Sequence, residues 1–438
     1  MCLKIGLVLV VLWNKTTSVR FYVKRQTFIM NTCDNSNFLT VEQALLRIES
    51  DLQAIDGFEQ LAIRSALNRI LAEDVHSKIA VPPHNNSAMD GYAVRSVDLD
   101  TKTDFSVVGT SWAGKPYNDS VNAGECIRIY TGAVIPSDCD CVIMQEDVER
   151  NADIIHIETG HKAGQNIRLA GEDIQIGDVV LTAGKYLLPA DIGLLASLGI
   201  PEIKVKRRLR VAFFSTGDEL CSLGEIPQAG QIYDSNRYTL YAMLTHLNIE
   251  FIDMGVIADQ PEAIEAAFIE AANGNDAIIT SGGVSVGDAD YVTDCLRRVG
   301  KINFWKIAMK PGKPLAFGTV KNAIFFGLPG NPVSVMATFY QFVQPALRLM
   351  MGQTRQTPIR FSVPCLTALK KHPGRVDFQR GILETDEQGQ LVVKSTGRQG
   401  SGILSSMSQA NCFIVLAKDS GNVAVGDEVV VEPFDGLI

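Results

Sequence analysis

The sequence predicts a multidomain protein that combines an α/β domain, built on a parallel sheet, with domains rich in β-strands. Between Leu209 and Phe326, short apolar runs alternate with helical spacings, which is typical of parallel strands joined by helical crossovers. Residues 81–176 and 358–438 instead contain short apolar runs separated by glycine turns. At 438 residues the chain is too long for one ordinary core, since a domain usually holds about 100–200 residues.

Composition restricts the kinds of partner. A net charge of −9 argues against a nucleic-acid-binding surface, so an anionic ligand must be attracted by local lysines and arginines. The nine cysteines include no C-x-x-C pair, and the six histidines lack ligand spacing. We therefore expect neither a disulfide framework nor a zinc site, and a reducing compartment such as the cytoplasm.

Residues 1–30 differ from the rest of the chain. The apolar run from Ile5 to Trp13 holds nine residues, too few to cross a bilayer, and no small-residue cleavage site follows it. We favour a natural start at Met30, with residues 1–30 as a non-native or unstructured extension. A signal peptide or anchor, and genuine structure, are the alternatives.

The remaining boundaries follow changes of pattern. Apolar spacing predicts one helix from Leu39, with Thr40 as its N-cap, and a second from Glu59 to Leu67. Helical spacing returns after residue 177. We expect 31–80 and 177–207 to pack together as a helical linking domain, with 81–176 inserted as a β-rich domain. The α/β domain then covers 208–357, and 358–438 form a small β-barrel.

Within the α/β domain we predict strands at 209–215, 251–257 and 276–279, and helices at 235–247 and 261–272. Glu219, Asp259 and the loop that begins near Ser281 each follow one of these strands. Because ligands bind at the carboxyl ends of parallel strands, these residues are expected to converge on one edge of the sheet.

The chain is organised around the loop TSGGVSVGDADY, from Thr280 to Tyr291. Glycine allows close approach of the backbone, and a helix N-terminus presents free N–H groups, so this loop suits an oxyanion. Asp288 and Asp290 suit a divalent cation or proton transfer beside it. A tight turn with a capping aspartate is the alternative.

A cationic segment follows. Lys306, Lys310 and Lys313 lie within eight residues, and two prolines and a glycine lie within residues 311–314. An extended chain would place Lys306 and Lys310 on one face. We interpret the segment as a shaped anion-binding loop, with a solvated edge as the alternative. A similar strand–turn–helix pattern recurs further on, with Pro332 at the first helical position.

Seven motifs occur in the order SAMDGYAV, TGA, GEDI, STGDEL, SGGVSVGDADY, KPGKP and GLPGNPVS. Together they closely resemble the molybdopterin molybdenumtransferase family, which includes the MoeA proteins of bacteria and the E domain of gephyrin. The resemblance covers Phe38 to Phe434. It implies a molybdopterin-binding α/β domain and an elongated homodimer.

The resemblance also implies a reaction. Adenylated molybdopterin and molybdate would give molybdenum cofactor and AMP, with Mg²⁺ or a similar divalent cation. Such chemistry depends on electrostatic positioning and a metal more than on a protein nucleophile. Partners implied by the pathway are a molybdopterin adenylyltransferase and maturation proteins of molybdoenzymes; no nucleic acid or membrane is implied.

Matching positions imply roles for individual residues. The acidic set would hold the metal or the hydrolytic water and comprises Asp259 and Asp290, with Glu219 beside them. The cationic set comprises Lys306, Lys310 and Lys313. The molybdate and molybdopterin contacts further comprise Ser281, Gly282, Gly283, Ser285, Pro329, Pro332, Ser334, Arg380 and Ser401. Residues implied to complete the cleft from the partner subunit are Asp90, Thr131, Arg168, Glu172 and Asp173.

Two alternatives belong to different classes of function. A molybdopterin adenylyltransferase shares the SGG loop, but residues 85–177 and 359–433 would be superfluous in a single-domain enzyme of that kind. A non-catalytic scaffold resembling gephyrin is the other alternative. This chain contains neither the second enzyme domain nor the long linker that gephyrin has.

Overall fold

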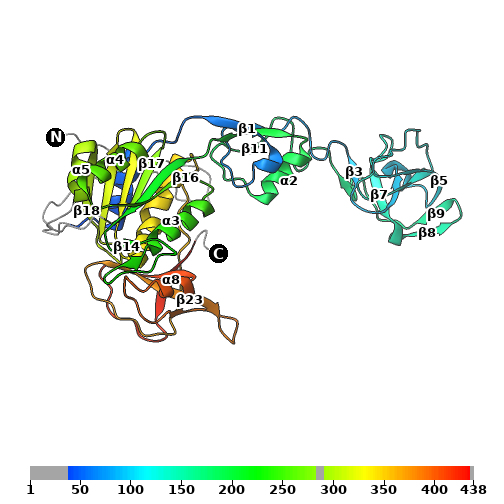
Figure 1. The fold of residues 1–438 in the computed structure, drawn as a ribbon. Helices are drawn as coiled ribbons and strands as arrows, with labels where there is room; N and C mark the ends of the chain where they lie inside the picture. Colours follow the sequence, from blue (N-terminus) through cyan, green and yellow to red (C-terminus); the bar gives the residue numbers. More distant parts are fainter. Residues whose placement is uncertain (1–37, 283–290, 435–438) are drawn as a thin grey trace, which may run out of the picture.

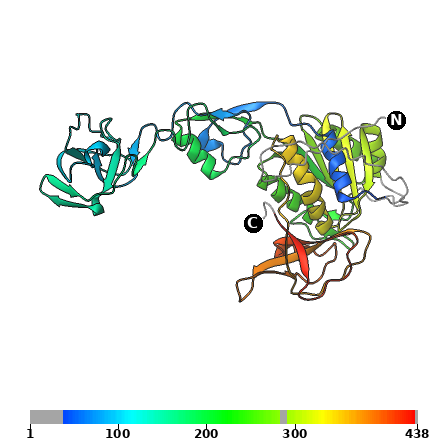
Figure 2. The same cartoon turned by 180° about the vertical axis from the view of Figure 1, so that it is seen from behind.

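The computed structural model describes residues 38–282 and 291–434. Figure 1 shows an elongated arrangement, with the α/β and C-terminal parts together at one end and the β-rich part at the other. A small linking part lies between them, and the reverse view in Figure 2 shows the same separation. The predicted fold class is confirmed, while the domain boundaries and the start at Met30 stay predictions. Within the described ranges, no helix has the length and apolar character to cross a membrane.

A six-stranded sheet forms the centre of the α/β domain, in the order β16-β13-β17-β21-β20-β18. The first four strands are parallel, and β20 and β18 are antiparallel additions. The predicted strands are confirmed. The bounds are β13 (Arg210–Thr216), β16 (Glu250–Ile257), β17 (Ala277–Ser281), β18 (Gly300–Lys306), β20 (Pro314–Val320) and β21 (Ala323–Leu328), with a separate parallel pair of β14 (Leu220–Cys221) and β15 (Ile232–Tyr233).

Helices cover both faces of this sheet, because alternate residues of its strands are apolar on opposite sides. Phe213 packs with one set of helices, and its neighbour Phe214 packs with the other. The predicted helices of this domain are confirmed as α3 and α4. The helices are α3 (Ser235–His246), α4 (Pro261–Ala271), α5 (Tyr291–Val299), α6 (Pro332–Thr338), the π-helical η4 (Phe339–Val343) and α7 (Gln344–Met350).

The predicted first helix is confirmed as α1 (Val41–Asp51). Thr40 Oγ1 accepts from the Gln43 N–H at 3.2 Å, and Gln43 Oε1 accepts from the Thr40 N–H at 3.0 Å, which closes a capping box. The buried Ala44 and Ile48 join the core of the α/β domain and contact η4 and α7. The expectation that this helix packs on residues 177–206 is therefore wrong.

The linking part combines short strands with one α-helix and one 3₁₀ turn. The predicted helix from Glu59 to Leu67 is wrong, because β1 (Phe58–Ala62) pairs antiparallel with β12 (Glu202–Lys206) and is followed by only one short 3₁₀ turn. Leu195 and Val205 pack in its small core. The other elements are η1 (Ile63–Ser65), β2 (Val75–His76), β11 (Val179–Leu181) and α2 (Pro189–Ser197).

The β-rich part is an insertion whose two ends meet. The Val81 N–H donates to the Ile174 carbonyl at 2.8 Å, and a six-stranded sheet of order β7-β4-β6-β5-β9-β8 lies beyond this point. The predicted short strands are confirmed. They are β3 (Asn86–Ser87), β4 (Gly91–Val94), β5 (Asp104–Ser111), β6 (Glu125–Ile129), β7 (Cys141–Met144), β8 (Val148–Asn151), β9 (Ile154–Ile157) and β10 (Ile167–Arg168), with the 3₁₀ turns η2 (Ser96–Asp98) and η3 (Gln145–Asp147).

The C-terminal part is a curled sheet of order β19-β23-β25-β26-β22, with β24 paired to β23. A bridge between Cys365 and Val393 joins the chain after β22 to β24, so the ends of the sheet approach each other as in a small barrel. Its elements are β19 (Met309–Lys310), β22 (Phe361–Pro364), β23 (Val376–Thr385), β24 (Leu391–Ser395), α8 (Leu404–Gln409), β25 (Cys412–Leu416) and β26 (Glu428–Pro433).

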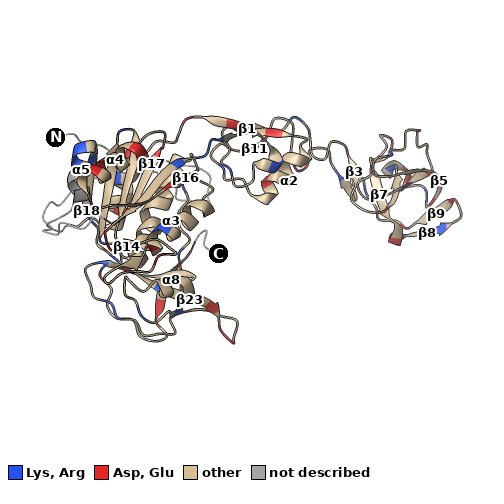
Figure 3. Ribbon diagram, viewed as in Figure 1, with Lys and Arg blue, Asp and Glu red and all other residues tan. Residues whose placement is uncertain are grey.

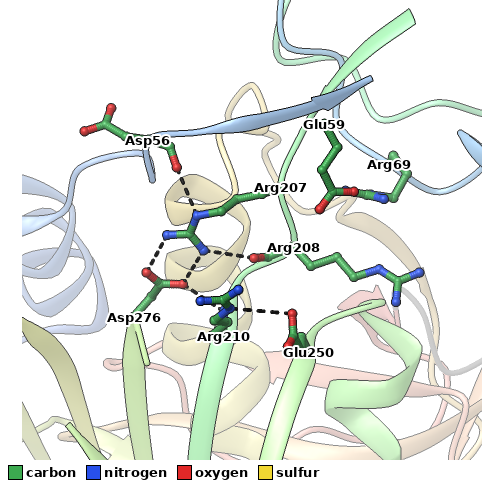
Figure 4. Close-up of polar contacts among 8 residues, drawn as sticks. All are labelled: Asp56, Glu59, Arg69, Arg207, Arg208, Arg210, Glu250 and Asp276. Atoms are coloured by element: carbon green, nitrogen blue, oxygen red, sulfur yellow. Dashed lines mark hydrogen bonds and ion pairs between the residues drawn. The ribbon is translucent and has the colours of Figure 1, made fainter. Parts of the chain in front are cut away.

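Arg207 joins the linking part to the α/β domain (Figure 4). Its guanidinium donates to both carboxylate oxygens of Asp276, at 2.7 and 2.8 Å, and its Nε donates to the Asp56 carbonyl at 3.0 Å. Burial acts to raise the pKa of Asp276, but the bonds from Arg207 and from the Arg210 N–H outweigh it and lower that pKa. This bidentate pair holds the two parts together where the chain passes between them.

Candidate active site

A cavity of about 780 Å³ lies between the carboxyl ends of the parallel strands and the C-terminal part. Its lining comes from three sources: loops after strands of the α/β sheet, the cationic segment, and loops of the C-terminal part. The lining residues are Thr216, Gly217, Glu219, Asp259, Gly282, Met309, Lys310, Pro311, Gly312, Lys313, Pro314, Pro329, Gly330, Asn331, Ser334, Arg375, Gln399, Gly400 and Ser401.

The parallel sheet brings Glu219, Asp259 and Gly282 together, as their positions after β13, β16 and β17 predict. Gly282 has φ +91°, and a Cβ there would lie 2.6 Å from the Thr216 carbonyl oxygen. Only glycine fits this position, since the backbones of the two loops touch. Gly283, Ser285 and Asp290 lie outside the described residues, so their roles stay predictions.

Carboxylates gather at this end of the cavity. The Asp259 N–H donates to Asp218 Oδ1 at 3.4 Å. Burial raises the pKa of Asp259, and the negative charges of Asp218 and Glu219 raise it further. Among residues 38–282 and 291–434, no three or more His, Cys, Asp or Glu form a metal-binding group. The arrangement nevertheless concentrates negative charge beside an open cavity.

Lysines occupy another part of the wall, although not as one extended strand. β18 ends at Lys306, and the chain then leaves the α/β sheet so that Met309–Lys310 pairs with β23 of the C-terminal part. Lys310 and Lys313 line the cavity, whereas Lys306 does not. Lys306 and Lys310 therefore do not belong to one extended strand, which was the condition for placing both on one face. Lys310 Nζ lies 3.7 Å from the buried Asp377, and Lys313 Nζ lies 5.1 Å from the Phe38 ring centroid.

The turn before α6 forms another part of the cavity wall. Pro329 and Ser334 line the cavity, while Pro332 occupies the first turn of the helix, as predicted, and does not line it. Asn236 Nδ2 donates to Ser281 Oγ at 2.8 Å and to the Gly330 carbonyl at 2.7 Å. Asn236 thus ties the end of β17 to the turn before α6, and the predicted site residue Ser281 is buried and does not line the cavity.

The C-terminal part closes the cavity with the loop 397–402. Ser401 lines it, and its carbonyl accepts from the Val333 N–H at 3.0 Å. Arg380 lies behind the loop and is 1% exposed; it donates to the Gly400 carbonyl at 3.1 Å and to Ser406 Oγ at 3.0 Å. Burial lowers the pKa of Arg380 to about 10. Arg380 does not line the cavity, so its predicted molybdate contact stays a prediction.

Sequence reasoning missed several lining residues. Gln399 is held by Arg380, whose N–H donates to its side-chain oxygen at 2.8 Å. Arg375 lies in the loop just before β23. Asn331 belongs to the recognised GLPGNPVS motif, and Gln399 belongs to the glycine-rich polar run 397–402, so both could have been found from the sequence. No local pattern marks Arg375.

The residues predicted to complete a partner's cleft all lie in the β-rich part, and none lines this cavity. Asp90 Oδ1 accepts from the N–H and hydroxyl of Thr131, both at 2.7 Å, and the backbone bond is the main reason that the pKa of Asp90 is lowered. Arg168 pairs with Asn86 between β10 and β3. Glu172 accepts from the Leu169 N–H at 2.9 Å, and Asp173 follows it in the same loop.

The fold and cavity define a multidomain α/β protein with a charged ligand site at a sheet edge. Family models match residues 39–199 as "MoeA N-terminal region (domain I and II)", 212–349 as "Probable molybdopterin binding domain" and 362–434 as "MoeA C-terminal region (domain IV)". The chain belongs to the molybdopterin molybdenumtransferase (MoeA) family, as its sequence motifs predict.

Comparisons with individual relatives agree with this family assignment. The chain is 49% identical over 402 residues to a molybdopterin molybdenumtransferase of Haemophilus influenzae, covering 91% of this chain and all of the relative. It is 35% identical to gephyrin of Dictyostelium discoideum, covering 90% of this chain and 62% of that protein. The crystal structure of a molybdopterin biosynthesis MoeA protein from Pyrococcus horikoshii OT3 matches 91% of this chain and all of its own, with a TM-score of 0.80 and 29% identity.

Proposed function

We propose that this enzyme of molybdenum cofactor biosynthesis inserts molybdate into adenylated molybdopterin and releases AMP. Family membership supports the class of reaction. The observation that carries the proposal is the division of the cavity wall, with Glu219 and Asp259 at the sheet edge and Lys310 and Lys313 on the cationic segment. Acidic and basic residues are otherwise interspersed along the chain (Figure 3), so the local cations are what attract an anion.

The two kinds of charge suit the two substrates. Molybdate is a tetrahedral dianion, and lysines donate charge-assisted hydrogen bonds to such a group. Lys310 and Lys313 would bind it, and Ser334 and Ser401 offer hydroxyl groups from two different domains. Adenylated molybdopterin is a phosphoanhydride, and the open cavity of about 780 Å³ provides room for part of such a ligand.

The carboxylate end fits a divalent cation. Mg²⁺ is usually held by one or two carboxylates, substrate phosphates and water, so a pair of side chains suffices. Asp259 and Glu219 both line the cavity. Burial first, and then the negative charges of Asp218 and Glu219, raise the pKa of Asp259, and a bound cation would oppose both effects. When bound, Mg²⁺ would neutralise charge that develops on the anhydride oxygens. Asp290, also assigned to this role, lies outside the described residues.

We further propose a two-fold homodimer. The β-rich part carries Asp90, Thr131, Arg168, Glu172 and Asp173 and extends away from its own α/β domain in Figure 1. A two-fold partner would bring each extended part to the other chain's cavity. A cytoplasmic location is proposed because the seven cysteines in the described ranges are free and buried.

Incubation of the purified full-length chain with adenylated molybdopterin, Mg²⁺ and molybdate tests the function. AMP release that depends on molybdate, together with reconstitution of an apo-molybdoenzyme, is expected. An Asp259→Asn variant should bind the nucleotide substrate and release AMP far more slowly. Activity only with unadenylated molybdopterin and ATP would show an adenylyltransferase instead, and no turnover of either substrate would refute the proposal.

A further inference from the structure

Arg375 lines the cavity, and no role given above uses it. It belongs to the loop that precedes β23, so it enters the site from the C-terminal part rather than from the α/β domain.

Backbone bonds fix the position. The Val376 N–H donates to the Ala308 carbonyl at 2.9 Å, and the Gly374 N–H donates to the Lys418 carbonyl at 2.8 Å. The register places Lys310 opposite Asp377 in the parallel pairing of β19 with β23. The residues on both sides of Arg375 are therefore held by backbone hydrogen bonds, and Val376 is bonded directly to the segment that carries Lys310.

The charge of Arg375 is available. Within 38–282 and 291–434, its guanidinium has neither a hydrogen bond nor an ion pair, and the residue is exposed. Lys310, in contrast, lies 3.7 Å from Asp377. Lys371 is buried behind this wall and donates to the His372 carbonyl at 2.9 Å. Burial lowers the pKa of Lys371, and the nearby charges of Lys310 and Arg375 lower it further against the opposing effect of Asp377.

Arg375 and Arg380 thus differ in what they can do. Arg380 is 1% exposed, and its guanidinium donates hydrogen bonds to Ser406 Oγ and the Gly400 carbonyl. Arg375 has its planar set of donors free at the cavity wall. A guanidinium binds a tetrahedral oxyanion through two parallel hydrogen bonds, which a lysine cannot do.

We propose that Arg375 is an oxyanion-binding residue, which contacts the tetrahedral oxyanion held beside Lys310 and Lys313. The inference rests on the proposed function for the identity of that oxyanion, which is molybdate or a phosphoryl group of the adenylated substrate. It gives the C-terminal part a direct share in substrate binding. The cavity is then complete only when this part is seated against β19.

Three variants of the full-length chain test the inference: R375A, R375K, and R64A as a matched control. Arg64 is an exposed arginine in η1 of the linking part and does not line the cavity. Molybdate binding is measured by equilibrium dialysis, alone and with adenylated molybdopterin, and AMP release is measured against the concentration of each substrate.

R375A is expected to weaken binding of the oxyanion by about tenfold to a hundredfold, the range for a charge-assisted pair, with an unchanged unfolding temperature. R375K should recover less than half of this loss on a logarithmic scale, and R64A should match the wild type. A shift in the molybdate requirement identifies molybdate as the bound anion, and a shift in the KM of the adenylated substrate identifies its phosphoryl group.

Equal effects of R375A and R64A, or no effect of R375A, would overturn the inference. Failure of the wild-type chain to bind molybdate under either condition, with no change in the KM of the adenylated substrate, would overturn it as well. Wild-type molybdate binding that R375A weakens, without any AMP release, would leave the inference standing and refute the proposed function instead.

Discussion

Replacing Lys310 with alanine changes two charges in the environment of a bound oxyanion. The lysine itself is lost, and Asp377 loses the cation that lies 3.7 Å away. Asp377 is 5% exposed, and Gln379 Nε2 donates to it at 3.2 Å. The charges of Lys371 and Arg380 act on it from nearby, so the loss of Lys310 leaves this carboxylate less completely neutralised. The alanine variant therefore removes an attraction and uncovers a repulsion.

The magnitude follows from these contacts. Loss of one charge-assisted hydrogen bond costs about 1.5–3 kcal/mol, which is roughly a tenfold to hundredfold rise in the half-saturating molybdate concentration. Changing Asp377 to asparagine as well removes the uncovered charge. The double variant should regain about threefold to tenfold of that loss, a typical coupling between residues in contact.

The assay is AMP release as a function of molybdate at saturating adenylated molybdopterin. Lys301→Ala is the matched control, because Lys301 is an exposed lysine at the start of β18 and does not line the cavity. A Lys310→Ala enzyme with unchanged molybdate dependence would refute the placement of Lys310 in the oxyanion site. A double variant no better than the single one would refute the part assigned to Asp377.

Three further predictions concern other parts of the chain. Asp290→Asn should lower AMP release by orders of magnitude while circular dichroism and the unfolding temperature stay unchanged; an unfolded variant would make Asp290 structural. Mixing Asp90→Ala chains with Asp290→Ala chains should restore activity, because one site in each mixed dimer regains both residues; continued inactivity despite subunit exchange, shown by mass spectrometry, would mean that each chain works alone. Asp276→Asn should reduce stability by about 1–3 kcal/mol near pH 7, because the amide keeps only one acceptor oxygen, so one hydrogen bond from Arg207 is lost and the other loses its charge. The pKa of Asp276 is lowered from 3.8 in the fold, so the difference in stability should persist above pH 3.8 and disappear as the pH falls through the folded value, which thermal melts across pH will show.

Elements with local signals were predicted correctly. Thr40 and Gln43 form the capping box of α1 within one turn, and α4 begins at Pro261, a residue that suits the first turn. β1 was mistaken for a helix because its partner, β12, lies in a distant part of the sequence. Cross-strand pairing of this kind leaves no mark in the local apolar spacing.

In the candidate site, too, some residues could be placed from local sequence, and others are brought together only by contacts between domains. Glu219 and Asp259 could be placed together because parallel strands present their carboxyl ends at one edge. The separation of Lys306 from Lys310 was not predicted, because β19 pairs with a sheet from another domain. Arg375 and Gln399 reach the cavity only through that docking, which spacing alone cannot predict.

The packing of α1 also bears on how the chain is made on the ribosome. Its apolar face, with Ala44 and Ile48, is covered by η4 and α7, which are translated only at the end of the α/β domain. The β-rich part is different, since its ends join at Val81 and Ile174 and its sheet uses only residues between them. This inserted part can therefore complete its fold during synthesis. The apolar face of α1 emerges early and stays uncovered until η4 and α7 have been translated.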